Sequence, residues 1–108
     1  VIFAGTGDDS VDGGGGTDRL SGGQGDDEFI FTNTGGTVTV IDFEDGPGGE
    51  DILDVSDFGF ADFASFLAVA SVAGPGGHDT LIQLDVDDSI LLENFDKADL
   101  DASDVFLF

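Results

Sequence analysis

The sequence predicts an all-β protein whose first quarter is a stack of short repeated units. Three observations indicate this class. Residues 4–30 fall into three rows of nine that share the same glycine, aspartate and apolar places. Several later segments, such as 37–43 and 105–108, are rich in β-branched or other apolar residues and are typical of strands. A single stretch, 60–72, carries apolar residues at helical spacing.

The nine-residue rows are 4–12, 13–21 and 22–30. Glycine holds the second and fourth places, aspartate the sixth, and a large apolar residue the eighth. The residues at these places are Gly5, Gly14 and Gly23; Gly7, Gly16 and Gly25; Asp9, Asp18 and Asp27; and Val11, Leu20 and Phe29. Ile2 fits the eighth place of the preceding row. A flexible linker preserves composition but not register, so these rows indicate a periodic structure.

The charge of the chain narrows the classes of partner. Two basic residues face 24 acidic ones, which gives a net charge of −22 over 108 residues. Such self-repulsion opposes compaction unless the acid is spread over solvent or a cation neutralises part of it. Nucleic acid and anionic membranes are poor partners for this surface. The 40% apolar content, with 11 Phe, argues against disorder and allows a modest core in one domain.

Several protein classes are excluded or disfavoured by what the sequence lacks. There is no cysteine, so disulfides and thiolate chemistry are excluded. No apolar run approaches the roughly 18 residues of a membrane helix, and no cleavable N-terminal signal is visible. The chain opens on Val-Ile-Phe, already in the repeat register. We therefore expect it to be the tail of a longer protein.

Each row has the composition of a cation-binding turn followed by a strand. Glycines at places two and four permit positive φ and direct backbone carbonyls toward a common point, where the aspartate adds a carboxylate. Oxygen ligands without nitrogen or sulfur suit Ca²⁺, which takes six to eight, better than the tight octahedron of Mg²⁺. One turn cannot complete such a shell, but stacked turns can. The alternative is an acidic glycine loop without a ligand.

The rows resemble the RTX nonapeptide, Gly-Gly-x-Gly-x-Asp-x-apolar-x, with Ala4 in place of one first glycine. The resemblance implies a parallel β-roll in which units two apart stack, so that row one lies over row three. One calcium ion would then lie between the turns of Asp9 and Asp27. A second site, at Asp18, would be partial, because residues 31–39 lack the motif. The candidate metal ligands are Asp9, Asp27, Asp18, Gly5, Thr6, Gly7, Gly14, Gly16, Gly22, Gly23, Gln24 and Gly25.

Residues 31–108 are expected to form a β-rich C-terminal cap on the repeats of residues 1–30. We expect strands at 37–43, 52–55 and 105–108, and a hairpin of 80–86 with 89–93 around Asp87-Asp88. A helix is expected over 60–72, with Asp62 as its N-cap and Gly74-Pro75 as its stop. These elements would cover the open end of the roll, which is otherwise an aggregation-prone edge.

The cap also resembles the C-terminal region of type I-secreted RTX proteins, including serralysin-type metalloproteases. The segments that carry the resemblance are "VIDFEDGPGGEDILDVSDFGF", "DTLIQLDVDDSILLENF" and the terminal "DVFLF". The resemblance implies a secreted, extracellular chain whose residues 104–108 form an uncleaved export signal recognised by the type I secretion machinery. The alternative for 104–108 is a plain edge strand, and both can hold.

Other acidic clusters and the single histidine carry less information. The acidic residues between Asp42 and Asp54 surround a glycine-rich turn and suggest either an accessory calcium site or, more simply, a solvated loop. Turn chemistry explains the aspartates of 85–88, and His78, in a glycine loop, is expected to be exposed.

We predict a non-catalytic, monomeric calcium-binding module. No His-Glu-x-x-His or Gly-x-Ser-x-Gly motif is present, and Cys and Tyr are absent. The alternative is an adhesive or carbohydrate-binding tail, but the exposed Trp and Tyr typical of such surfaces are lacking.

Overall fold

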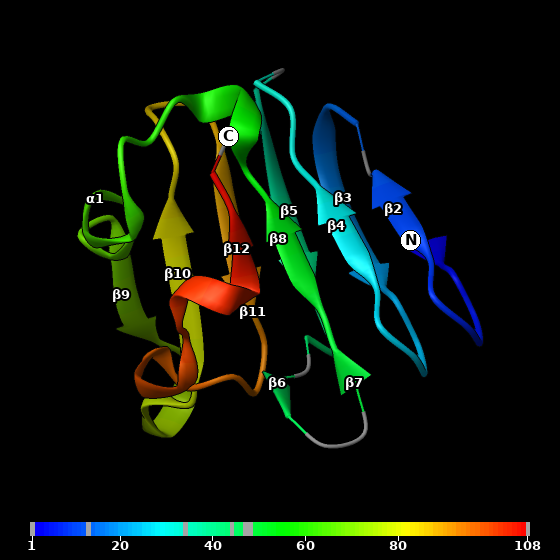
Figure 1. Ribbon diagram of the computed structural model, residues 1–108. Coiled ribbons are helices and arrows are strands. Elements are labelled where there is room, and N and C mark those ends of the chain that lie inside the picture. The colour runs from blue at the N-terminus through cyan, green and yellow to red at the C-terminus, as the bar shows by residue number, and fades with distance from the viewer. Residues whose placement is uncertain (1, 13, 34, 44, 47–48, 108) are drawn as a thin grey trace.

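The computed structural model describes residues 2–12, 14–33, 35–43, 45–46 and 49–107. Two sheets pack face to face (Figure 1). The six-stranded sheet has the order β1-β3-β5-β11-β10-β9, and the four-stranded sheet the order β12-β8-β4-β2. The strands of the first are β1 (Ile2–Phe3), β3 (Gly16–Ser21), β5 (Gly36–Val40), β9 (Ala70–Ala73), β10 (Asp79–Gln83) and β11 (Ser89–Leu92). Those of the second are β2 (Ser10–Asp12), β4 (Glu28–Ile30), β8 (Ile52–Asp54) and β12 (Val105–Phe106).

The smaller elements lie in the connections. A two-stranded hairpin, β6 (Asp45–Gly46) with β7 (Gly49–Glu50), interrupts the connection from β5 to β8. One short helix, α1 (Phe63–Leu67), precedes β9. Single 3₁₀ turns lie at Ser56–Phe58, Pro75–Gly77, Lys97–Asp99 and Ala102–Asp104. Within the described ranges, no helix is long and apolar enough to cross a membrane.

The expected all-β class is confirmed, but the strands are not all parallel. Every pair in the four-stranded sheet is parallel. In the six-stranded sheet, β1, β3, β5 and β11 run parallel, while β10 pairs antiparallel with both β11 and β9. The reason is the length of the connection. Only a short loop separates β10 from β11, and such a loop can join only antiparallel neighbours.

The eighth-place residues of the rows form the core between the two sheets. Val11, Leu20 and Phe29 are 3%, 0% and 0% exposed. Leu53 continues the same line, because it pairs with Phe29 across β4 and β8. Since the side chains of a strand alternate between faces, one inward residue per short strand fills this layer. The expectation that the eighth place faces the interior is confirmed.

The expected helix over 60–72 is wrong beyond Leu67. Asp62 does cap its start, with Oδ1 accepting a hydrogen bond from the Ser65 amide at 2.9 Å. Residues 70–73 instead form β9, paired with β10. The Ala-Ser-Val-Ala segment fits either structure by composition, and pairing with a neighbouring strand overrides a weak helical preference.

The cap elements cover both sheets where the repeats end. β5 pairs with the repeat strand β3 and β8 with the repeat strand β4, and β11 and β12 extend the two sheets further. The expected hairpin is present as β10 and β11, but its loop is longer than the expected Asp87-Asp88, because β10 ends at Gln83, opposite Ser89. The C-terminal strand is shorter than expected and ends at Phe106, while residue 108 lies outside the described residues.

Candidate metal centre

The turns of rows one and three stack on each other at one end of the strands. The turn of row one (4–9) joins β1 to β2, and that of row three (22–27) joins β3 to β4 (Figure 1). Thr6 forms an isolated parallel bridge with Gln24, and Ser10 is in register with Glu28. Each pair joins a residue of row one to the residue at the same place of row three, so units two apart stack, as the resemblance implied.

Glycine is required in row three because the turns approach each other so closely. Gly5, Gly7, Gly23 and Gly25 all have positive φ, between 82° and 108°. A Cβ on Gly23 would overlap the carbonyl oxygen of Gly5, and one on Gly25 would lie 2.5 Å from that of Gly7. A Cβ on Gly5 or Gly7 would have nothing within 4 Å. The row-three glycines therefore make room for the carbonyls of row one.

The sixth-place aspartates form a ladder across these turns. The Asp9 amide donates to Asp27 Oδ1 at 2.9 Å, and the Asp27 amide donates to Asp51 Oδ1 at the same distance. The other carboxylate oxygen, Oδ2, is buried without a hydrogen-bond partner in Asp9, Asp18 and Asp27. The sixth place of every row thus carries an oxygen that neither water nor a protein donor reaches.

Burial raises the pKa of Asp27 above its usual value of 3.8. The hydrogen bond from the Asp9 amide lowers the pKa, and the nearby carboxylates of Asp9, Asp42 and Asp8 raise it further. Asp27 is 2% exposed. A buried carboxylate among like charges is costly when ionised, and a bound cation removes this cost.

The donor set fits calcium and does not fit a softer metal. Carboxylate oxygens and backbone carbonyls are hard ligands, and the two turns contain no His, Cys or Met. Among the described residues, no three side chains of Asp, Glu or His gather around one point. An ion between these turns would therefore depend mainly on backbone carbonyls, with Asp9 and Asp27 as its charged ligands. Beside the stack lies an open hollow of about 220 Å³, and the residues that line it are Asp8, Asp9, Ser10, Asp26, Asp27, Glu28 and Ile52.

The turn of row two lies at the opposite end of the strands. Gly14 and Gly16 have positive φ, and Asp18 has its buried oxygen there. Its neighbour is the turn after β4, where a Cβ on Gly36 would lie 2.5 Å from the carbonyl oxygen of Gly16. That neighbouring turn lacks the sixth-place aspartate of the motif. The structure thus stacks the predicted residues of row two on a turn that supplies fewer ligands.

Asp51 is a ladder member that the sequence reasoning missed. β8 is in register with β4, with Leu53 opposite Phe29, so Asp51 takes the sixth place and Leu53 the eighth. The segment "GPGGEDILD" (46–54) fits the nonapeptide register with proline in the second place, and this signal was available. Asp51 is fully buried, so the solvated-loop interpretation is wrong for it. The side chains of Asp45 and Glu50 lie outside the described part of the chain.

Asp42 supports the turn of row three from the other side. Its carboxylate accepts hydrogen bonds from Ser21 Oγ at 2.6 Å, the Gly22 amide at 3.1 Å and the Gly23 amide at 3.0 Å. Together with Asp51, it fixes the backbone that carries Asp27. The accessory-calcium interpretation of this cluster remains a prediction.

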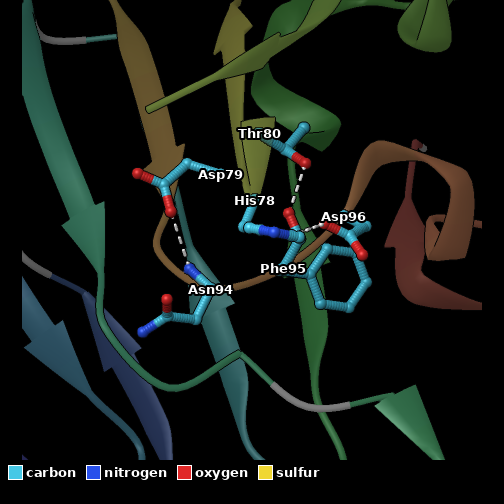
Figure 2. A network of polar contacts seen from close by, with 6 residues as sticks. All are labelled: His78, Asp79, Thr80, Asn94, Phe95 and Asp96. Carbon is cyan, nitrogen blue, oxygen red and sulfur yellow. Dashed lines mark hydrogen bonds and ion pairs between the residues drawn. The ribbon is translucent and has the colours of Figure 1, made fainter. Parts of the chain in front are cut away.

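His78 takes part in a network of polar contacts between the start of β10 and residues 94–96 (Figure 2). Its Nδ1 lies 3.2 Å from Asp96 Oδ1, and its side chain is 71% exposed, as expected. Next to it, Asp79 Oδ1 accepts from the Asn94 amide at 2.9 Å, and Thr80 Oγ1 donates to the Phe95 carbonyl at 2.7 Å. These contacts join the start of β10 to the segment that follows β11.

Comparison with known proteins agrees with the geometry of the turns. Residues 1–29 match the family model described as the RTX calcium-binding nonapeptide repeat (4 copies). A search of curated proteins found no match to the chain. The matched unit is a structural calcium-binding repeat and not a catalytic one. Over residues 1–29, about a quarter of its length, the chain is therefore similar in sequence to RTX calcium-binding nonapeptide repeats.

Proposed function

We propose that the repeats form a calcium-binding parallel β-roll within the C-terminal folding and export module of a larger secreted protein. In this proposal residues 1–30 bind Ca²⁺, and residues 31–108 cap the roll. One ion binds between the turns of rows one and three, with Asp9 and Asp27 as charged ligands and carbonyls of residues 5–7 and 22–25 completing the shell. The observation that carries the proposal is the buried, partnerless Oδ2 of all three sixth-place aspartates.

Electrostatics supports a coupling between calcium and folding. The chain carries −22, and the stacked turns bring Asp8, Asp9, Asp27 and Asp42 together. Without a cation, closing the stack brings these carboxylates together and buries Asp27. With calcium, Asp9 and Asp27 become ligands, and the charge of the ion offsets the repulsion from the neighbouring carboxylates. A ligand that binds only the folded state adds about 2.7 kcal/mol per site at a hundredfold excess over Kd, which is large against a typical total of about 5–15 kcal/mol.

The location of the chain follows from the affinity expected of such a site. Extracellular calcium modules commonly bind at about 10⁻⁴–10⁻³ M. In a cytosol with far less free calcium the turns stay open, and an open chain suits passage through a narrow export channel. Outside the cell, millimolar calcium closes the stack. The proposal also includes export, with residues 104–108 as the export signal. This part of the proposal is based on sequence resemblance.

Calorimetric titration of two alanine variants tests the site. Asp27→Ala should weaken calcium binding more than Asp18→Ala, because the turn of Asp27 stacks on a second motif turn and that of Asp18 does not. Both variants remove one sixth-place carboxylate with a buried Oδ2, so they are matched in chemistry. Equal losses would show that the two motif turns do not share an ion.

A further inference from the structure

Asp42 lies in the cap, shortly after the end of β5, and its side chain holds the start of the row-three turn. Its Oδ1 accepts a hydrogen bond from the Gly22 amide at 3.1 Å, and its Oδ2 accepts from the Gly23 amide at 3.0 Å and from Ser21 Oγ at 2.6 Å. Two successive amides that converge on one carboxylate form an anion-binding concavity of the backbone, which the positive φ of Gly23 permits. Both oxygens of Asp42 are therefore engaged by one short stretch of row three.

This contact fixes the direction of the carbonyl groups in the same stretch. In a trans peptide unit, the N–H and the C=O lie in one plane and point in opposite directions. The Gly22 amide points to Asp42, so the Ser21 carbonyl of the same peptide unit points away from it. That carbonyl accepts a hydrogen bond from the Ala4 amide at 2.9 Å, so the side opposite Asp42 is the side of row one. The Gly23 amide also points to Asp42, and the Gly22 carbonyl of its peptide unit therefore faces row one as well.

The turn after β4 shows the same arrangement at the opposite end of the strands. Asp88 Oδ1 accepts hydrogen bonds from the amides of Gly35 at 2.9 Å and Gly36 at 3.0 Å. The Gly35 carbonyl shares its peptide unit with the Gly36 amide and points the other way, to the Gly16 amide of row two at 3.5 Å. In both stacks, a carboxylate of the cap behind two successive amides directs a carbonyl toward the preceding turn.

Row one presents its own oxygens to the row-three turn. A Cβ on Gly23 would overlap the carbonyl oxygen of Gly5, so that carbonyl points at row three. The Oδ2 atoms of Asp9 and Asp27, buried without a hydrogen-bond partner, belong to the same two turns. The Gly22 carbonyl thus faces the turn with which row three would share its ion. Because both oxygens of Asp42 are on donors of row three, Asp42 can act on that ion through the Gly22 carbonyl without being a ligand.

We propose that Asp42, oriented by Ser21, is a positioning residue that fixes the Gly22 carbonyl as a ligand of the calcium ion between rows one and three. This inference rests on the repeat ion proposed above and adds a residue outside the matched repeats to the determinants of its affinity. Groups that orient the ligands of a metal typically contribute 10–100-fold to its affinity. Asparagine has one acceptor oxygen and turns an NH₂ group toward the remaining donors. Asp42→Asn should therefore raise the Kd for calcium by roughly tenfold or more.

Calorimetry on the full chain in about 0.15 M KCl, where long-range charge effects are screened, compares Asp42→Asn with Asp8→Asn. Both variants remove a negative charge that acts on Asp27. Asp8 Oδ1 accepts a hydrogen bond from the Asp26 amide at 2.9 Å, which an asparagine oxygen can keep. Asp8→Asn therefore measures the loss of charge, for which we expect a rise in Kd of no more than about fivefold. Equal rises in Kd for the two variants would overturn the proposal.

Terbium luminescence distinguishes a positioning role from a merely structural one. Tb³⁺ takes oxygen ligands as Ca²⁺ does, and its luminescence lifetimes in H₂O and D₂O count the water molecules bound to the ion. At one ion per chain, Asp42→Asn should hold about one water more than the wild type, because water replaces the released Gly22 carbonyl. Asp8→Asn should hold the wild-type number. A destabilised fold with intact ligands binds the ion more weakly with the same hydration, so an unchanged count for Asp42→Asn would overturn the proposal.

Ser21→Ala decides the question if Asp42→Asn does not fold. It keeps both amide contacts of Asp42 and removes only the hydroxyl that orients the carboxylate. Its Kd for calcium should rise by roughly threefold or more, and a wild-type Kd would overturn the proposal. Asp27→Ala tests the repeat ion separately. If Asp27→Ala binds calcium as the wild type does, the repeat ion itself is wrong. If it loses the ion while Ser21→Ala and Asp42→Asn keep the wild-type Kd, only the positioning role is wrong.

Discussion

Substituting Gly23 by alanine tests the stacking of the turns on which the repeat site depends. Gly23 has φ +82°, and a Cβ there would overlap the carbonyl oxygen of Gly5. Gly5 is the matched control, because it belongs to the same stacked pair, has φ +99° and has nothing within 4 Å of its would-be Cβ. Both variants force alanine into the left-handed region. Only Gly23→Ala also pushes the two turns apart.

The expected magnitudes follow from these two costs. A left-handed conformation costs a non-glycine residue roughly 1–2 kcal/mol, so Gly5→Ala should destabilise the chain by about that amount. Overpacking adds roughly 1–3 kcal/mol, so Gly23→Ala should cost about 2–5 kcal/mol in total. The obstructing atom is backbone, which cannot rotate away as a side chain would. Because the separated turns no longer share ligands, Gly23→Ala should also weaken calcium binding more than Gly5→Ala does.

Urea unfolding at saturating calcium measures the stability difference, and calorimetry measures the affinity. If the two variants lose equal stability, a Cβ at residue 23 does not collide with the Gly5 carbonyl, and the two turns lie farther apart than in this structure. A Gly23→Ala chain with wild-type affinity would show that the two turns need not meet to bind the ion.

Two further predictions concern the core and the charge of the ladder. Leu20→Ala should lower the free energy of unfolding by roughly 2–5 kcal/mol in urea melts at saturating calcium, because Leu20 is 0% exposed. The control Thr17→Ala, on the exposed face of the same strand, should change it by no more than about 0.5 kcal/mol. A loss as small as that of the control would place Leu20 outside the core. Burial raises the pKa of Asp27 in the folded chain above its usual value of 3.8. Protonated Asp27 therefore adds to the free energy of unfolding at pH below 3.8, and this contribution is lost as the pH rises through the raised pKa. Asp27→Asn has no carboxyl proton to lose, so without calcium at pH 7 the variant should be more stable than the wild type. With calcium it should be less stable. A change in stability of the same sign with and without calcium would contradict a metal role for Asp27.

The repeat geometry could be predicted from the sequence because each constraint recurs in register. Gly5 and Gly23 share the second place, and the structure brings them into contact because rows one and three stack directly. The eighth-place residues were predicted as core for the same reason, since one inward side chain per strand leaves no choice of face.

The cap was harder to predict because long-range pairing decides between structures that are locally similar. Residues 70–73 have the composition of a helix end, yet they pair with β10. Asp51 was missed as a ladder member because the β6–β7 hairpin lengthens its coil beyond two rows and hides the register. Asp88 accepts hydrogen bonds from the amides of Gly35 and Gly36, which lie far from it in the sequence, and no local pattern marks such a meeting.

The central claim is that calcium closes the stacked turns, and circular dichroism of the chain tests it most directly. The chain is measured in excess chelator, then with Ca²⁺, and in parallel with Mg²⁺. We predict that the repeats lack their β signal in chelator, that the cap retains part of its own, and that Ca²⁺ restores the full spectrum while Mg²⁺ at the same concentration does not. A complete β spectrum in chelator with no gain on adding Ca²⁺, or an equal gain with Mg²⁺, would contradict the account.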